Sequence, residues 1–235
     1  MTDSRTLLII PTKNEHQTIH RVMEEVVALG IDDLHVLVVD DDSIDGTWRT
    51  YGTRWAADSE HHHLLRRCGP QKGRGYALRE AYQWALDHEP GYDFVLEMAG
   101  NTTDDPSVLQ SMQEALSSGS DVVIAEREQG GEPSTEGPRR TQTLARMATG
   151  APVHDIESGF RGYQREVLEA ILPRLKATSH GIKAEVLAAA TRRGFTVTGI
   201  PVASRLLPDD GYAQGGNASP LQLLTLWVRR LFGLV

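Results

Sequence analysis

The stretch LHVLVVDDDSIDGT, residues 34–47, begins as an unbroken apolar run and ends as an acidic loop that contains glycine. Apolar runs of this length, rich in β-branched residues, are typical of strands buried on both faces of a sheet. A helical pattern follows from about residue 47 to residue 58. The stretch therefore predicts a strand, a polar loop at its carboxyl end and a helix, in that order.

The same alternation extends along the chain in both directions. Strands are predicted at 6–10, 62–67, 94–98, 121–127 and 195–205. Helices are predicted at 16–29, 74–87, 106–118, 140–149, 164–175, 181–193 and 221–235, with a Gly- and Pro-rich loop at 128–140. This pattern indicates an α/β fold with a mostly parallel sheet and helices on both faces. Residues 1–205 are expected to form a single domain, followed in 206–235 by a flexible loop and an amphipathic helix.

The composition is that of a globular protein with an acidic balance. The 235 residues can bury a sizeable core, and the net charge of −8 offers no broad cationic footprint for nucleic acid. The single Cys68 excludes an intrachain disulfide, and the start MTDSRTLLII lacks the features of a secretory signal. These features predict a cytoplasmic protein without a nucleic-acid partner.

Polar residues cluster in three segments that follow or precede predicted elements: PTKNE (11–15), VVDDDSIDGT (38–47) and GPQKGRGYAL (69–78). Ligands of open α/β sheets bind beyond the carboxyl ends of strands. Acidic side chains together with Lys72 and Arg74 at a glycine-containing helix start suit a ligand with a base and an anionic tail, a nucleotide. The alternatives are a structural glycine turn and, at 45–47, an ordinary helix cap.

These segments, followed by HDIESGFRGYQREVL (154–168) and GIPVASR (199–205), resemble glycosyltransferase family 2, close to its dolichol-phosphate mannosyltransferase-like branch. The resemblance covers about residues 6–205. It implies a GT-A (Rossmann-like) fold and a nucleotide-diphosphate-sugar donor, with Arg161 and Arg205 meeting phosphates. The donor-binding residues that it implies are Pro11, Lys13, Asn14, Glu15, Asp40, Asp41, Asp42, Lys72, Gly73, Ala99, Gly100, Asn101 and Arg205.

The segment FVLEMAGNTTDDP (94–106) departs from the family pattern. Where the family usually carries Asp-x-Asp to hold Mg²⁺ or Mn²⁺, this chain has Ala-Gly-Asn, with Ala99 and Asn101 at the two acidic positions. Asn101 and Asp105 remain as weak metal candidates, because a neutral amide suits a hard dication poorly. Asp104 and Asp105 also fit a cap for the helix that begins at Pro106. Weak or absent metal dependence is therefore expected.

The catalytic candidates are Asp155, Arg161 and His180. The segment TSHGIKAEVL (178–187) lacks the acidic pair that serves many family members as a base. A phosphate acceptor needs no general base, because it is already an anion. His180 is a base for a hydroxyl acceptor or a surface histidine, and Asp155 is a base or an orienting partner for Arg161.

The resemblance implies inverting transfer of a sugar to a polyprenyl phosphate at a membrane surface. A small soluble acceptor, such as a natural-product intermediate, is the alternative within the same class. A non-catalytic nucleotide-sugar-binding homologue is the alternative of another class. The helix at 221–235 either lies on a membrane surface, with Arg229 and Arg230 at headgroups, or packs on the domain or on a second subunit.

Three consecutive histidines, 61–63, also raise the possibility of a metal site. Positions 61 and 63 share one face of a strand, but no third ligand is near in sequence. An exposed strand edge is therefore the favoured interpretation.

Overall fold

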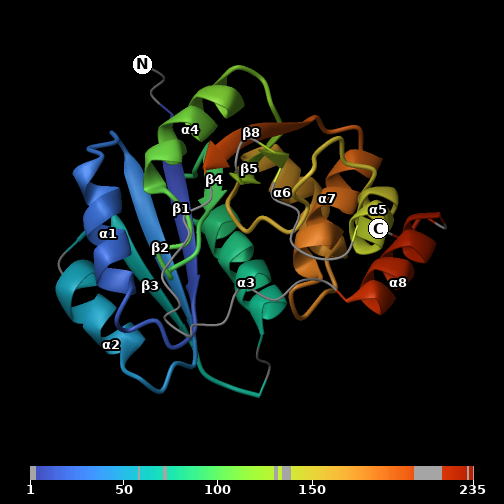
Figure 1. Cartoon of the computed structure of the whole chain (residues 1–235). Coiled ribbons are helices and arrows are strands. Elements are labelled where there is room, and N and C mark those ends of the chain that lie inside the picture. The colour runs from blue at the N-terminus through green and yellow to red at the C-terminus, as the bar shows by residue number, and fades with distance from the viewer. Residues whose placement is uncertain are drawn as a thin grey trace.

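The computed structural model describes residues 4–57, 59–70, 73–129, 132–133, 139–203, 219–231 and 233–234. Strands and helices alternate along the first half (Figure 1): β1 Thr6–Thr12, α1 Ile19–Ala28, β2 Leu34–Asp41, α2 Thr47–Tyr51 with a π-helical turn Gly52–Ala56, β3 His62–Arg67, α3 Arg74–Asp87 and β4 Phe94–Glu97. The second half contains a 3₁₀ turn Pro106–Val108, α4 Leu109–Ser117, β5 Val122–Gln129, β6 Glu132–Pro133, α5 Arg139–Thr149, β7 Arg161–Gln164, α6 Arg165–Ile171 with a 3₁₀ turn Leu172–Arg174, α7 Ile182–Arg192, β8 Val197–Ala203 and α8 Pro220–Leu231.

The described strands form one sheet in the order β3-β2-β1-β4-β7-β5-β6, and β8 pairs with β5. Strands β3, β2, β1 and β4 are parallel, with Pro11 opposite Val39 and Asp40 opposite Arg66. Parallel strands end at the same edge, so the loops after β1, β2 and β4 meet in one place. The predicted α/β fold is confirmed.

Strand β7 is a central element that the sequence pattern missed, and the two-residue strand β6 lies within the predicted 128–140 loop. The helix predicted at 164–175 begins at Arg165, and the four residues before it form a strand antiparallel to both β4 and β5. A side chain at Gly162 would lie 2.7 Å from Leu96 Cδ2 and 3.1 Å from Leu116 Cδ1. This strand is thus held by its neighbours in the sheet, and no periodicity within four residues could reveal it.

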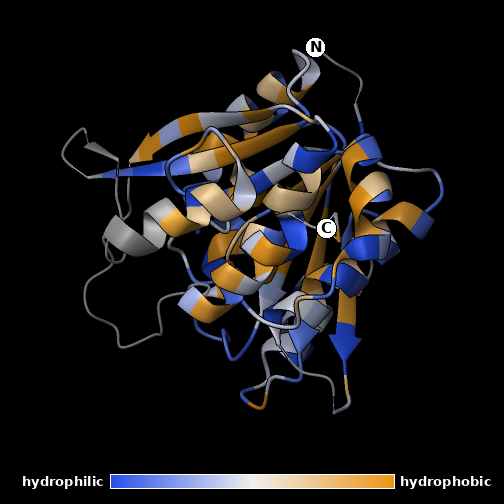
Figure 2. Ribbon diagram, turned by 90° about the vertical axis from the view of Figure 1, so that its right-hand side faces the viewer, coloured by the Kyte–Doolittle hydropathy of each residue, from blue (hydrophilic) through white to orange (hydrophobic). Residues whose placement is uncertain are grey.

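The sheet is buried on both faces, as the unbroken apolar strands predict. Leu7 and Ile9 of β1 face the core under α3, α5, α6, α7 and α8, whereas Leu8 and Ile10 face the core under α1, α2 and α4. Figure 1 shows α1 and α2 on one side of the sheet and α3, α6 and α7 on the other. In Figure 2 the hydrophobic colour is concentrated on the strands and on the helix faces turned toward them.

The C-terminal helix α8 packs on the domain through α5 and α7. Leu223 and Leu226 are buried in the same core as the sheet residues. Arg229 pairs with Glu185 of α7, and Arg230 Nη1 donates to the Met147 carbonyl at 3.2 Å. Of the two alternatives for this helix, these contacts agree with packing on the domain, because both arginines turn toward the protein. Within the described ranges, no helix has the length and apolar character to cross a bilayer.

Candidate active site at the carboxyl ends of the parallel strands

The loops after β1 and β2 are bonded to each other through Asn14 and its neighbours. The Asn14 amide donates to Ser43 Oγ at 2.9 Å, and the Ile44 amide donates back to Asn14 Oδ1 at 3.0 Å. The Glu15 amide donates to Thr47 Oγ1 at 2.9 Å. Asn14 is thus a structural link, and it adopts a positive φ of 57° that asparagine tolerates.

The acidic cluster at the end of β2 is satisfied by protein groups. Asp40 is fully buried and accepts from the Ser43 amide at 3.0 Å. Asp41 forms an ion pair with Arg67 of β3 and accepts from the Gly73 amide at 2.8 Å. These contacts offset the carboxylate repulsion that would otherwise make this loop costly.

The same contacts show what the predicted donor residues do in this structure. Lys13 Nζ donates to the backbone carbonyl oxygens of Asp41 and Asp42 and so links the loop after β1 to the loop after β2. Pro11 is buried within β1, opposite Val39. Pro11, Glu15 and Asp40, predicted for the base pocket, thus lie together at the carboxyl ends of β1 and β2.

Glu15 is the unusual acid of the crevice. Its Oε2 is buried without a hydrogen-bond partner and lies against Gly100, where a Cβ would overlap it. Burial raises the pKa of Glu15 to about 8; Arg74 opposes this increase, whereas Asp45, Asp40 and Asp104 add to it. Burial thus favours the neutral form of this carboxyl group.

Close backbone approach brings α7 to the crevice. A side chain at Gly73 or Gly75 would collide with the carbonyl oxygens of Thr178 and Ala177, respectively, and the Gly75 amide donates to Thr178 O at 3.2 Å. The glycines at the start of α3 are thus required for contact with the 176–181 loop. Gly73 also has a φ of 123°, which disfavours any side chain.

Three cations surround one carboxylate at this junction. Arg74, Arg127 and Lys183 all lower the pKa of Asp104, although burial has the larger, opposite effect and leaves that pKa raised. Arg74 Nε is buried without a hydrogen-bond partner. Burial, followed by the charges of Arg74, Arg161 and Arg127, lowers the pKa of Lys183 to about 8 against the opposing effect of Glu157. The cluster therefore carries positive charges that repel one another.

His180 lies beside these cations. The ring is half-buried, and its pKa is lowered first by burial and then by Lys183 and Arg74. The imidazole is consequently neutral near pH 7 and has one nitrogen free to accept a proton. His180 thus lies beside two cations of the crevice, Arg74 and Lys183.

Arg161 and Asp155 have structural partners instead. Arg161 is buried and donates to backbone carbonyls of Ser158 at 2.7 Å, Lys183 at 2.6 Å and Ile156. Asp155 accepts two hydrogen bonds from the Arg127 guanidinium, at 2.6 and 3.0 Å. The expected pairing of Asp155 with Arg161 is wrong, and the expected phosphate contact of Arg161 does not fit a guanidinium committed to the protein interior.

The end of β4 does not match the donor set of a divalent metal. Ala99 has no ligand atom, and Asn101 Oδ1 already accepts from the Thr103 amide at 3.3 Å and from its hydroxyl at 2.6 Å. Asp105 accepts from the Ser107 amide at 3.0 Å, as a helix cap does. Asp104 accepts from the Ala99 amide at 2.8 Å among the three cations. A dication here would have the Asp104 carboxylate and the repelling charges of Arg74 and Lys183.

Two predicted donor residues, Lys72 and Arg205, lie outside the described residues. Sequence reasoning assigned no role to Lys183 or Arg127 and left Arg74 as one of two cations in a loop. Lys183 lies on α7, whose other residues are mainly apolar and buried. A lysine inside such an apolar run is the sequence feature that could have indicated a functional role.

Comparison with known proteins shows the family of the chain. The family model described as "Glycosyl transferase family 2" matches residues 7–172. The chain belongs to this family. A Mycolicibacterium smegmatis polyprenol monophosphomannose synthase is 31% identical over 206 residues, which are 84% of this chain and 76% of the relative. An undecaprenyl-phosphate mannosyltransferase of Micrococcus luteus is 30% identical over 84% of this chain and 82% of its own length.

Solved structures show the same fold. A Mycobacterium tuberculosis glucosyl-3-phosphoglycerate synthase, solved with Mn²⁺, UDP and phosphoglyceric acid, matches with a TM-score of 0.66 and 17% identity over 99% of this chain and 78% of the other. Its complex with Mg²⁺ and UDP gives a TM-score of 0.66 with 21% identity, covering 97% of this chain and 79% of the other. This member of glycosyl transferase family 2 is thus a GT-A glycosyltransferase.

Proposed function

We propose that this glycosyltransferase moves a sugar, mannose as in the names of its relatives, from a nucleotide-diphosphate donor to a polyprenyl phosphate. The observation that carries the proposal is the cluster of Arg74, Lys183 and Arg127 at the crevice. Both substrates of such a reaction are phosphate anions. A buried cluster of cations fits them better than it fits a neutral acceptor.

The electrostatics of the cluster favour occupation by an anion. The lowered pKa of Lys183 and the unpartnered Nε of Arg74 mark positive groups that gain from a negative ligand. A donor diphosphate placed there would gather negative charge as the sugar leaves, and fixed cations stabilise charge that develops in a transition state. Glu15, whose pKa is raised to about 8 mainly by burial, lies beside the same cluster and would be a hydrogen-bond donor to the nucleotide when protonated.

The proposed transfer is a single inverting displacement. A phosphate oxygen of the acceptor attacks the anomeric carbon, the bond from that carbon to the donor diphosphate breaks, and the nucleoside diphosphate leaves with the electron pair. The acceptor oxygen is already anionic, so no residue has to remove a proton. Asp155, the carboxylate that was a candidate base, is paired with Arg127.

We propose further that transfer does not require a tightly bound divalent metal. The residues at the end of β4 do not form a metal donor set, and Arg74, Lys183 and Arg127 supply positive charge at the same place. Cationic side chains then take over the neutralisation of the leaving diphosphate.

A small hydroxyl-bearing acceptor is the second candidate, and His180 favours it. Its neutral imidazole beside Arg74 and Lys183 could accept the proton of an attacking hydroxyl. Replacement of His180 by Gln separates the two acceptors. The variant should transfer normally to a phosphate acceptor and lose about 10²-fold or more of kcat with a hydroxyl acceptor.

Contact with a lipid surface is proposed for α8. Leu221, Leu224 and Val228 are 73%, 46% and 40% exposed and recur at helical spacing on the side away from the core. Such a stripe inserts shallowly into a bilayer surface where a polyprenyl phosphate would be presented. If the stripe instead joins two subunits, a Leu221→Ser, Leu224→Ser variant would change the sedimentation of the protein rather than its vesicle binding.

The deciding experiment combines a donor screen with a transfer assay. Thermal unfolding is followed with GDP-, UDP- and dTDP-sugars, with and without Mg²⁺ or Mn²⁺, because a ligand of the folded state raises the melting temperature. The best donor, labelled in its sugar, is then incubated with polyprenyl phosphate, and organic-phase label is measured with and without EDTA. Label in that phase supports the proposal. Donor binding without any transfer would indicate a non-catalytic homologue, and transfer abolished by EDTA would refute metal independence.

A further inference from the structure

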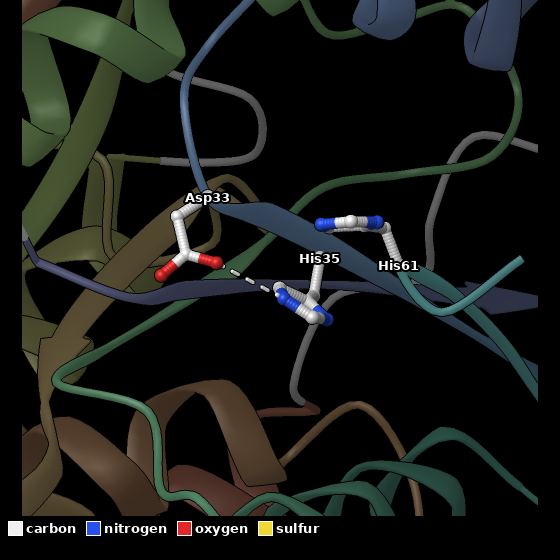
Figure 3. Close-up of side chains that lie close together, drawn as sticks. All are labelled: Asp33, His35 and His61. Carbon is white, nitrogen blue, oxygen red and sulfur yellow. Dashed lines mark hydrogen bonds and ion pairs between the residues drawn. The ribbon is translucent and has the colours of Figure 1, made fainter.

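We propose that Asp33, His35 and His61 bind a divalent transition-metal ion, with Zn²⁺ the best match, at the amino ends of β2 and β3. One potential ligand atom from each residue lies within 4.8 Å of the others. Figure 3 shows the carboxylate and the two imidazoles gathered at the start of the strands. At a rise of about 3.3 Å per residue, this place is roughly 20 Å along β2 from Asp41 in the active-site crevice.

The backbone holds the three residues in place without help from an ion. The Thr6 amide donates to Asp33 O at 3.2 Å, and the Val36 amide donates to His61 O at 2.7 Å. His35 lies between them as the second residue of β2 and is buried. The histidine run therefore supplies one ligand, His61, and the start of the neighbouring strand supplies the other two.

The contacts of His35 Nε2 conflict in the absence of an ion. This nitrogen lies 3.2 Å from Asp33 Oδ1 and 3.4 Å from Arg5 Nε. Nε2 can either carry a proton for the carboxylate or offer a lone pair to the guanidinium, but not both. An ion bound to Nε2 and Oδ1 would satisfy both acceptors and would compete with the Arg5 guanidinium, whose Nε also lies 3.9 Å from Asp33 Oδ1.

The surroundings prepare His35 as a neutral ligand. Its Nε2 faces Asp33, and its other nitrogen, Nδ1, lies 3.5 Å from Nε2 of His63. With Nε2 on an ion, Nδ1 carries the proton and points it toward His63, which is the usual arrangement behind a metal-bound histidine.

The ligand set selects the ion. Two imidazoles and one carboxylate form a mixed nitrogen and oxygen set that suits Zn²⁺ and related ions better than Mg²⁺ or Ca²⁺. Asp33 and His61 are exposed, which leaves a route for entry and a position for water. The site then joins the turn before β2 to the residue before β3.

The test uses the full chain without a histidine tag, treated with EDTA, freed of EDTA and kept without nucleotide. Calorimetry with Zn²⁺ should show one saturable site, and Co²⁺ should give visible absorption bands of a low-symmetry site. His61→Ala and Asp33→Asn should each weaken Zn²⁺ binding at least about 10-fold. Asparagine accepts the φ of 48° at position 33, so D33N removes the charge without backbone strain.

His62→Ala is the matched control, because His62 packs against Trp55, with ring centroids 5.8 Å apart, and lies outside the ligand set. It should leave Zn²⁺ affinity and the Co²⁺ spectrum unchanged. Arg5→Gln should tighten Zn²⁺ binding, since a competing cation is removed. The proposal is overturned if Zn²⁺ does not bind saturably, or if binding survives both H61A and D33N. It also fails if H62A weakens binding as much as H61A does.

Discussion

Lys183→Met should make the free protein more stable and the donor complex weaker. The pKa of Lys183 falls from an ordinary 10.5 to about 8 in the folded chain, mainly because the group is buried. At about 1.4 kcal/mol per pKa unit, keeping this lysine charged at pH 7 costs roughly 3 kcal/mol. The substitution also removes the hydrogen bond from Nζ to Glu157 O, 2.7 Å long, which contributes about 1 kcal/mol. The expected net gain in the free energy of unfolding is therefore about 1–2 kcal/mol.

The effect on the donor has the opposite sign. A hydrogen bond from a charged group contributes about 1.5–3 kcal/mol, so K183M should bind a nucleoside diphosphate roughly 10- to 100-fold more weakly. The measurements are denaturant unfolding without ligand and calorimetry with GDP, UDP and dTDP. Lys176→Met removes an exposed lysine from the loop before α7 and should change neither quantity.

The pH dependence provides an independent check. Between pH 8 and 10.5 the unfolded chain holds the proton that folded Lys183 has lost, so stability of the parent protein should rise with pH in that window. Donor affinity should fall over the same window, because the neutral amine no longer attracts phosphate. K183M should show neither trend. A variant that unfolds more readily than the parent yet binds nucleoside diphosphate equally well would refute the reasoning.

Three further substitutions test other parts of the crevice. Glu15→Gln should remove one pH dependence of stability, measured by denaturant unfolding. In the parent protein the stabilisation by Glu15 is fully present below about pH 4.5 and falls by about 2–4 kcal/mol as the pH rises through 8. An unchanged profile in the variant would contradict the raised pKa. Gly75→Ala should destabilise the chain by about 1–3 kcal/mol and weaken nucleotide binding, since its methyl group meets the Ala177 carbonyl; parental melting and binding would disprove the close approach. Asp155→Asn should lower the free energy of unfolding by about 3 kcal/mol, because it removes the ion pair with Arg127. A variant of unchanged stability that transfers sugar more slowly would instead indicate that Asp155 acts as a base.

The chain order of elements and the position of the crevice follow from the sequence. The unbroken apolar runs at 6–10 and 34–39 place two strands in the middle of a parallel sheet, and each is followed by the polar residues that mark its carboxyl end. The sequence also shows that the segment 99–101 after β4, Ala-Gly-Asn, contains no carboxylate. Such features are local, because hydrophobic periodicity and residue chemistry can be read within a few turns or strands.

The partners of the charged groups were decided by the tertiary structure. Arg161 was expected at phosphate and Asp155 beside it, but the fold turns Arg161 onto backbone carbonyls and gives Asp155 to Arg127. Lys183 reaches the crevice because Gly75 lets the loop before α7 touch α3. These contacts join residues far apart in the chain, and their electrostatic energies depend on burial and distance, quantities that exist only once the strands and helices have packed.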